Sequence, residues 1–324
     1  MYSSSGPPVN IYEKSITKMF AEMEEATGGR LQFEIHYGGE LYNEFDGLMA
    51  CQDNAIQSTA AAHDAVASLD ERWDFLSLPF LFDDGDHMGR FMQTPAWNSV
   101  LDSLEQKGLM SFRGNLWRGE GASGDTIGYF FYTGFPPDKL ENWAGKKVRV
   151  RMTPTQVKMA ELLGFQAQEV NMAELPMAMQ TGMVEGVLGV CGVGIMNFLR
   201  YQDYYDYVLS NRVVIGTHFR GWNTTWYNQL PDDIKDIIDP IAADMVDNFS
   251  FDTRDSDDGW AIITSNLDVV TLTSEELAKW RDLLEPLYAD YRAKTGFAEL
   301  FEAAEATRGG EPVKPLKEPI KEWY

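Results

Sequence analysis

The sequence predicts an α/β protein, and three observations lead to this prediction. Helical and strand patterns alternate through the first third of the chain, which is typical of a mostly parallel sheet with helices on both faces. The hydrophobic fraction of 44% and the aromatic fraction of 13% are those of a folded protein with packed cores. The length of 324 residues is enough for two domains of ordinary size.

The first third supplies the alternating elements. Apolar residues at helical spacing predict a helix over 10–27, which ends at Gly28 and Gly29. Alternating apolar residues predict a strand over 31–37. The other elements expected in this part are a helix over 44–53, a small-residue strand over 55–62, a dense apolar segment over 76–82 and a helix over 86–107.

The later part of the chain continues the pattern and adds one long helix. Pro231 falls in the first turn of a helix, and the acids after it suit the positive helix end. Pro240 lies too deep for that turn and is expected to break this helix and to begin a second one. The second helix would run to about residue 264, a length of about 37 Å at 1.5 Å per residue, and could span two domains. Strands are expected over 110–117, 127–133, 208–219, 221–229 and 269–272, with helices over 196–207 and from Thr273.

The charge of the chain limits its partners. The formal net charge of −23 argues against nucleic acid and against anionic membranes, because both need cationic protein surface. A small anionic ligand would need a local cation, since the overall field repels it. The four histidines have no metal-ligand spacing, and no apolar run approaches the ~20 residues of a membrane span.

Two points stay open at this level. Cys51 and Cys191 are compatible with a disulfide or with two buried thiols. The chain begins without a cationic stretch and an apolar signal region, so the protein is either cytoplasmic or a processed form.

The segment Val148-Arg149-Val150-Arg151 carries the main functional question. Alternation in a strand places both arginines on one face and both valines on the other. Strand arginines commonly point to solvent. At the end of a strand in a cleft, however, a guanidinium can bind a carboxylate through two parallel hydrogen bonds.

A series of short motifs resembles one family over nearly the whole chain, the extracytoplasmic solute receptors of TRAP (tripartite ATP-independent periplasmic) transporters. Each motif is short, and their order and spacing together carry the resemblance. The motifs are Gly38-Gly39-Glu40-Leu41, Leu78-Pro79-Phe80-Leu81-Phe82, Trp143-Ala144-Gly145-Lys146-Lys147-Val148-Arg149-Val150, Glu174 followed by Met179-Gln180-Thr181-Gly182-Met183-Val184-Glu185-Gly186, and Asn223 seven residues before Leu230-Pro231.

The resemblance implies a two-lobed periplasmic solute-binding fold, with hinge strands between the lobes, one long helix spanning both and a ligand cleft between them. Lobe I would comprise 1–126 plus 215–250, and lobe II 127–214 plus 251–324. It also implies a periplasmic location, with the signal peptide removed, and hand-over of the ligand to TRAP membrane permease subunits. A monomer without a cofactor is expected.

On this resemblance Arg149 is the carboxylate-binding arginine, and Arg151 is not. Tyr129 lies where many members have a second arginine, Met172 where several have a stacking phenylalanine, and Gly189 where some sialic-acid-binding members have an asparagine. These departures favour a monocarboxylate with an apolar or aromatic body, which aromatic and methionine contacts would suit.

Further candidate contacts come from the first lobe and from the strand that returns to it. The carboxyl ends of strands line the ligand site in such folds, and His63 is expected to be the most exposed polar residue there. A buried histidine with satisfied hydrogen bonds is the alternative. The other candidates are Ser4, Ser5, Glu44, Phe219, Trp222 and Asn223.

Other classes of function have weaker support. The segment 185–190 lacks the acid and the tryptophan of the metal-binding members, so no metal is expected. An enzyme is disfavoured because the chain has no dinucleotide-binding glycine pattern, nucleophile elbow or Cys–His signature. The sequence does not distinguish a receptor for transport from one that serves a signalling system.

Overall fold

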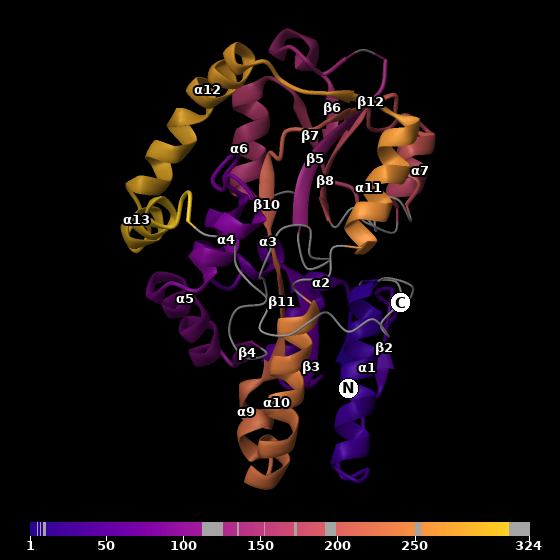
Figure 1. Ribbon diagram of the computed structural model, residues 1–324, viewed down its shortest axis with the longest axis vertical. Helices are drawn as coiled ribbons and strands as arrows, with labels where there is room; N and C mark the ends of the chain where they lie inside the picture. Colours follow the sequence, from indigo (N-terminus) through magenta and orange to yellow (C-terminus); the bar gives the residue numbers. More distant parts are fainter. Residues whose placement is uncertain are drawn as a thin grey trace.

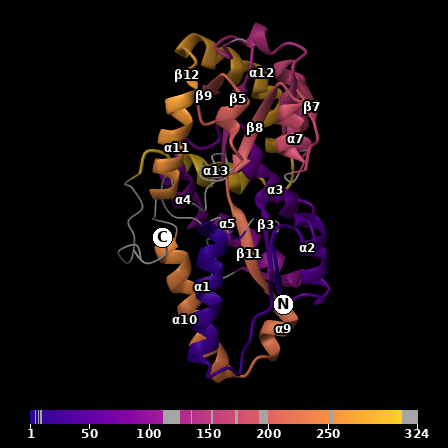
Figure 2. The same cartoon turned by 90° about the vertical axis from the view of Figure 1, so that its right-hand side faces the viewer.

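Two β-sheets form the centres of two lobes, one above the other (Figures 1 and 2). The computed structural model describes residues 1–4, 6, 8, 11–111, 126–134, 136–151, 153–171, 174–191, 199–249 and 254–310. Helices cover both sheets, as the alternating pattern predicted.

Sheet A, in the lower lobe of Figure 1, has the strand order β2-β1-β3-β11-β4. Strand β1 is parallel to β2 and β3, whereas β11 is antiparallel to both of its neighbours. The strands of sheet A are β1 (Tyr2–Ser3), β2 (Ile35–His36), β3 (Ser58–Ala62), β4 (Leu109–Ser111) and β11 (His218–Asn223). The helices of this lobe are α1 (Ile11–Ala26), α2 (Glu44–Gln52), α3 (His63–Val66), α4 (Gly85–Met92), α5 (Pro95–Gln106), α9 (Thr224–Gln229) and α10 (Asp232–Phe249), with a 3₁₀ helix over Glu71–Ser77.

Sheet B, in the upper lobe, has the order β12-β9-β5-β8-β6-β7, and β10 pairs with β5. Its strands are β5 (Thr126–Tyr132), β6 (Lys147–Arg149), β7 (Gln166–Gln168), β8 (Gly186–Cys191), β9 (Tyr207–Leu209), β10 (Val214–Gly216) and β12 (Asp268–Val270). The remaining helices are α6 (Pro154–Leu163), α7 (Leu175–Gln180), α11 (Arg254–Asn266), α12 (Ser274–Arg292) and α13 (Ala298–Ala306), with 3₁₀ helices over Leu140–Trp143 and Tyr201–Asp203.

The last helices connect the two lobes. Helix α12 packs against α6 in the upper lobe, and α13 packs against α4 and α5 in the lower lobe. One hydrophobic cluster accordingly contains Trp73 and Phe297 together with Trp143 and Trp280. The predicted lobe boundaries at 126/127, 214/215 and 250/251 stay a prediction.

Local sequence signals account for several element ends. Thr153 accepts a hydrogen bond from the Gln156 amide and Pro154 occupies the first turn of α6, both favoured at a helix start. Gly164 ends α6 with φ 82°, a left-handed conformation that suits glycine. The same threonine–proline device at Thr94 begins α5, so the single helix predicted over 86–107 is in fact two helices.

The helix predicted over 196–207 is wrong, because the described residues from 199 form a 3₁₀ helix over Tyr201–Asp203 and then the start of β9. Two predictions about the chain after β10 are also wrong. Helix α10 continues through Pro240, which therefore neither breaks it nor begins a new helix. Pro240 lies on the exposed side, while Ile238 and Ala242 pack into the core beside α1. The predicted long helix is covered by α10 and α11 as separate elements, and residues 250–253 lie outside the described range.

The second wrong prediction is the strand over 221–229. The chain is helical from Thr224, because the Asn223 side chain accepts a hydrogen bond from the Trp226 amide and caps α9.

Candidate functional site

Arg149 is the last residue of β6 and lies in the interior. The residue is 4% exposed, which excludes the solvent-facing alternative for this arginine. Its Nε donates to the carbonyl of Val170 at 3.2 Å. Burial raises the pKa of the Tyr205 hydroxyl, and the positive charge of Arg149 acts in the opposite direction.

The register of sheet B places three predicted residues near one another. Arg149 pairs with Val187 on β8, and Gly189 is two residues further along that strand, opposite Tyr129 on β5. Residues paired across a ladder, or two apart along a strand, share a face of the sheet. With strands about 4.8 Å apart and a rise of about 3.3 Å per residue, the Arg149 and Gly189 backbones are about 8 Å apart.

Arg151 follows β6 and connects the two lobes. Its Nη2 donates to the Glu44 carboxylate at the start of α2, and its Nε pairs with the carboxylate of Asp64 in α3. The Arg151 backbone amide donates to Oε1 of Gln156 at 2.9 Å. Burial by itself would lower the pKa of Arg151, but the two carboxylates outweigh it and raise that pKa. Glu44, predicted to contact the ligand, is thus in an ion pair.

His63 lies at the carboxyl end of β3 and is fully buried. The expectation that it is the most exposed polar residue there is therefore wrong. Its ring nitrogens lie 3.2 Å from the Thr217 carbonyl and 3.2 Å from the Ser77 hydroxyl. The ring packs so closely on Gly216 that a Cβ there would lie 2.0 Å from its Cε1. Burial lowers the pKa of His63, so the ring is neutral at pH 7.

His218 begins β11 beside this end of β3. Burial of the ring, together with the charge of Arg220, lowers the pKa of His218 to about 3. Its charge neighbours include Glu44, Arg151 and His63. Polar side chains from both lobes therefore converge where β3 and β6 end.

Trp222 and Asn223 lie at the other end of β11. His218 pairs with Ala62 and Trp222 with Ser58, so Trp222 is about 13 Å further along the strand at 3.3 Å per residue. Asn223 is buried, caps α9 and donates to the carbonyls of Cys51 and Gln52 at 2.8 and 3.1 Å.

The aromatic candidates pack inside the sheet A lobe. Trp222 packs near Phe20, Phe33 and Trp226, and it is 2% exposed. Phe219 is fully buried near Trp73.

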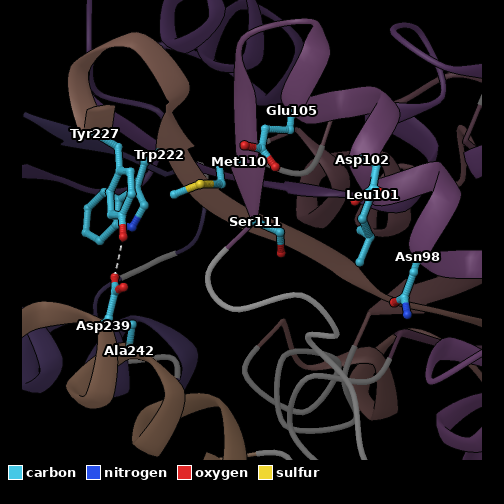
Figure 3. A pocket seen from close by; sticks show the side chains of 10 residues that line it. All are labelled: Asn98, Leu101, Asp102, Glu105, Met110, Ser111, Trp222, Tyr227, Asp239 and Ala242. Atoms are coloured by element: carbon cyan, nitrogen blue, oxygen red, sulfur yellow. Dashed lines mark hydrogen bonds between the residues drawn. The ribbon is translucent and has the colours of Figure 1, made fainter. Parts of the chain in front are cut away.

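A surface hollow of about 260 Å³ lies at this end of sheet A, between α5, β4, β11, α9 and α10. Figure 3 shows Trp222 beside Tyr227, whose hydroxyl donates to Asp239 at 2.6 Å. Asp102 and Glu105 of α5 also line it. The hollow contains none of the arginines above, so we do not assign it to the carboxylate site.

Ser5 and Met172 lie outside the described residues. Ser4 is buried, and its hydroxyl donates to Oε1 of Glu13 at 2.6 Å. Sequence reasoning missed Asp64 and His218; the His63-Asp64 pair directly after a strand was a signal for the first.

Three observations bear on cofactors and context. Cys51 is buried and free, which excludes the disulfide with Cys191. The residues with described structure contain no group of three or more His, Cys, Asp and Glu side chains suited to a metal ion. Nor does any helix among them have the length and apolar composition needed to cross a membrane.

Comparison with known families decides the classification. Residues 2–295 match the family described as bacterial extracellular solute-binding protein, family 7. The chain belongs to this family. The predicted resemblance to TRAP solute receptors is thereby confirmed, and the family consists of solute-binding proteins rather than enzymes.

Individual relatives agree with this assignment. The chain is 26% identical to the C4-dicarboxylate-binding periplasmic protein DctP of Shewanella loihica over 290 residues, 88% of this chain and 82% of the relative. The predicted two-lobed α/β fold is confirmed by solved structures of TRAP periplasmic solute-binding proteins. One, from Shewanella oneidensis with bound succinate, has a TM-score of 0.83 at 18% identity and covers 94% of this chain and 97% of its own. Another, from Sulfitobacter with bound β-D-galacturonate, has a TM-score of 0.83 at 17% identity, with coverages of 95% and 99%.

Proposed function

We propose that this protein is a periplasmic receptor that captures a small organic acid and delivers it, as a monomer, to the membrane permease of a TRAP transporter. Family membership supports the receptor role. The names of the relatives support the ligand class, because C4-dicarboxylate, succinate and galacturonate all carry a carboxylate.

The observation that carries the proposal is the position of Arg149. It is a buried guanidinium at the carboxyl end of a strand, where ligands bind in open α/β sheets. A carboxylate bound by this planar fork would form two charge-assisted hydrogen bonds, which gain strength away from water. In a chain of net charge −23 such a local cation is what an anionic ligand requires.

The proposed ligand is a monocarboxylate with an apolar or aromatic body. Gly189 and Tyr129 pair with each other across β8 and β5, and neither residue type supplies a second cation. Met172, Ser5, His63, Glu44 and Phe219 remain proposed contacts on the strength of the resemblance alone. Trp222 and Asn223 are not retained as proposed contacts, because they lie at the far end of β11 from His218.

A thermal-shift screen over carboxylates tests the ligand class. A compound at 100 times its dissociation constant adds about 2.7 kcal/mol of stability. Monocarboxylates with aliphatic or aromatic bodies should raise the melting temperature and should be recovered unchanged. Shifts with neutral sugars or polyols alone would contradict the proposal, and turnover of the bound compound would favour an enzyme.

Calorimetry with Arg149→Ala tests the anchor. We expect affinity for the acids found in the screen to fall about 100-fold or more, since two hydrogen bonds to a charged group are lost. Arg281→Ala, at an exposed arginine over the Phe80 ring, is the matched control and should bind as the unaltered protein does. Unchanged affinity in a folded Arg149→Ala protein rules the anchor out.

A further inference from the structure

We infer that Glu44 and Asp64 set the charge selectivity of the receptor: by neutralising Arg151, they withhold a second cation from the ligand and exclude dicarboxylates. The inference rests on the proposed function and deepens it. It concerns the pair of arginines near the end of β6, of which one is assigned to the ligand and the other is not.

Arg151 lies where it could bind a second carboxylate of a ligand. It follows Arg149 by two residues, a separation of about 7 Å along an extended chain. That separation is on the scale of a small dicarboxylic acid. A second free guanidinium at this point would match a ligand with a carboxylate at each end.

The contacts of Arg151 show that its charge is paired with carboxylates of the protein itself. Two nitrogens of the guanidinium meet two different carboxylates, with Nη2 on Glu44 and Nε on Asp64. The side chain of Arg151 is 12% exposed, that of Glu44 18% and that of Asp64 1%. Water therefore screens this group weakly, and its charges act strongly on a neighbouring ion.

The charge of this trio is not balanced. One guanidinium faces two carboxylates, which leaves the trio with one net negative charge. Neither nearby histidine adds a positive charge at pH 7, because burial lowers the pKa of His63 and of His218. Arg220 is a further buried guanidinium near His218, and its charge also acts on the carboxylate of Glu13. A second carboxylate brought to this place would meet net negative charge and would lose its hydration without compensation.

Such an arrangement discriminates by repulsion, which is a common route to specificity. A ligand that ends in a methyl group or a ring at this place avoids the cost. Removing one carboxylate of the trio would leave one positive and one negative charge and would free one nitrogen of the guanidinium. The structure therefore assigns Glu44 and Asp64 to selectivity, acting through Arg151.

The test uses matched acids that differ only by a methyl group in place of a carboxylate. Butyrate is paired with succinate, and 4-methylbenzoate with terephthalate. Calorimetry on the full chain gives the ratio of dissociation constants, dicarboxylate over monocarboxylate, for each pair. In the unaltered protein we expect the monocarboxylate to bind more tightly in both pairs.

Glu44→Gln should lower this ratio about tenfold, the effect of one charge-assisted hydrogen bond gained by the dicarboxylate. Glu44→Asp keeps the charge and should preserve the original ratio. Glu185→Gln is the matched control, because it removes a carboxylate from an ion pair with Lys146 (3.0 Å) at the opposite end of β6 and β8. If Glu44→Gln fails to fold, Asp64→Asn makes the same change in charge.

The outcomes separate this inference from the proposed function. Tighter binding of dicarboxylates by the unaltered protein would overturn the inference and the proposed preference for monocarboxylates, and would leave the receptor role standing. An unchanged ratio in a folded Glu44→Gln protein, or an equal change in Glu185→Gln, would overturn the inference alone. If no acid of either kind binds, the proposed function fails and the inference fails with it.

Discussion

The two ends of strand β11 both pair with β3 but have opposite character. At the His218 end, polar and charged side chains from both lobes converge around Arg151 and His63. At the other end, Trp222 packs among aromatic rings and Asn223 satisfies backbone groups. Membership of a strand therefore does not place a residue in the site; its register along the strand decides.

Among these variants, Trp222→Ala should cause the largest loss of unfolding free energy. Truncating a fully packed aromatic side chain costs about 3–5 kcal/mol of unfolding free energy. Urea unfolding measures this loss. Because Trp222 lies about 13 Å from the His218 end, affinity for a bound acid should change less than about twofold, an amount below 0.5 kcal/mol. A loss of affinity above tenfold would return Trp222 to the site as originally predicted.

Asn223→Ala should have the next largest effect. The substitution removes the cap of α9 and the hydrogen bonds to the Cys51 and Gln52 carbonyls. We expect a loss of about 2 kcal/mol in unfolding free energy, again with unchanged ligand affinity. Asn228→Ala, at an exposed position near the end of the same helix, is the control. Equal stability of the two variants would show that the Asn223 bonds contribute nothing.

The His63 end should respond to pH. The folded-state pKa of His63 is lowered, so below pH 6.5 the unfolded chain binds a proton that the folded chain does not. The contribution of His63 to stability is complete above pH 6.5. It decreases as the pH is lowered below 6.5, by up to about 1.4 kcal/mol per pH unit. Unfolding measured from pH 7.5 to 5.5 should show this slope.

His63→Gln supplies the comparison for that slope. The variant should reduce the slope, whereas His36→Gln, at the edge of sheet A, should retain it. His87 is also fully buried with a lowered pKa, and the pKa of His218 is lowered to about 3, so these two histidines account for the slope that remains. An identical slope in His63→Gln would contradict the neutral buried ring.

The sequence predicted the alternation of elements, the two lobes and the position of Arg149, because periodicity and short motifs are local. It did not reveal the partners of Arg151, since Glu44 lies 107 residues away and only the packed fold brings them together. The Pro240 break was wrong because packing of the inner face of α10 outweighs one missing backbone hydrogen bond. The capping role of Asn223 was readable, yet the motif match drew attention to ligand contact instead.

A crystal structure with a monocarboxylate from the thermal-shift screen tests the central claim most directly. We predict its carboxylate on the Arg149 guanidinium through two parallel hydrogen bonds of about 2.7–2.9 Å, with Arg151 still paired to Glu44 and Asp64. A carboxylate bound to Arg151, or a ligand in the hollow beside Trp222, would contradict the account.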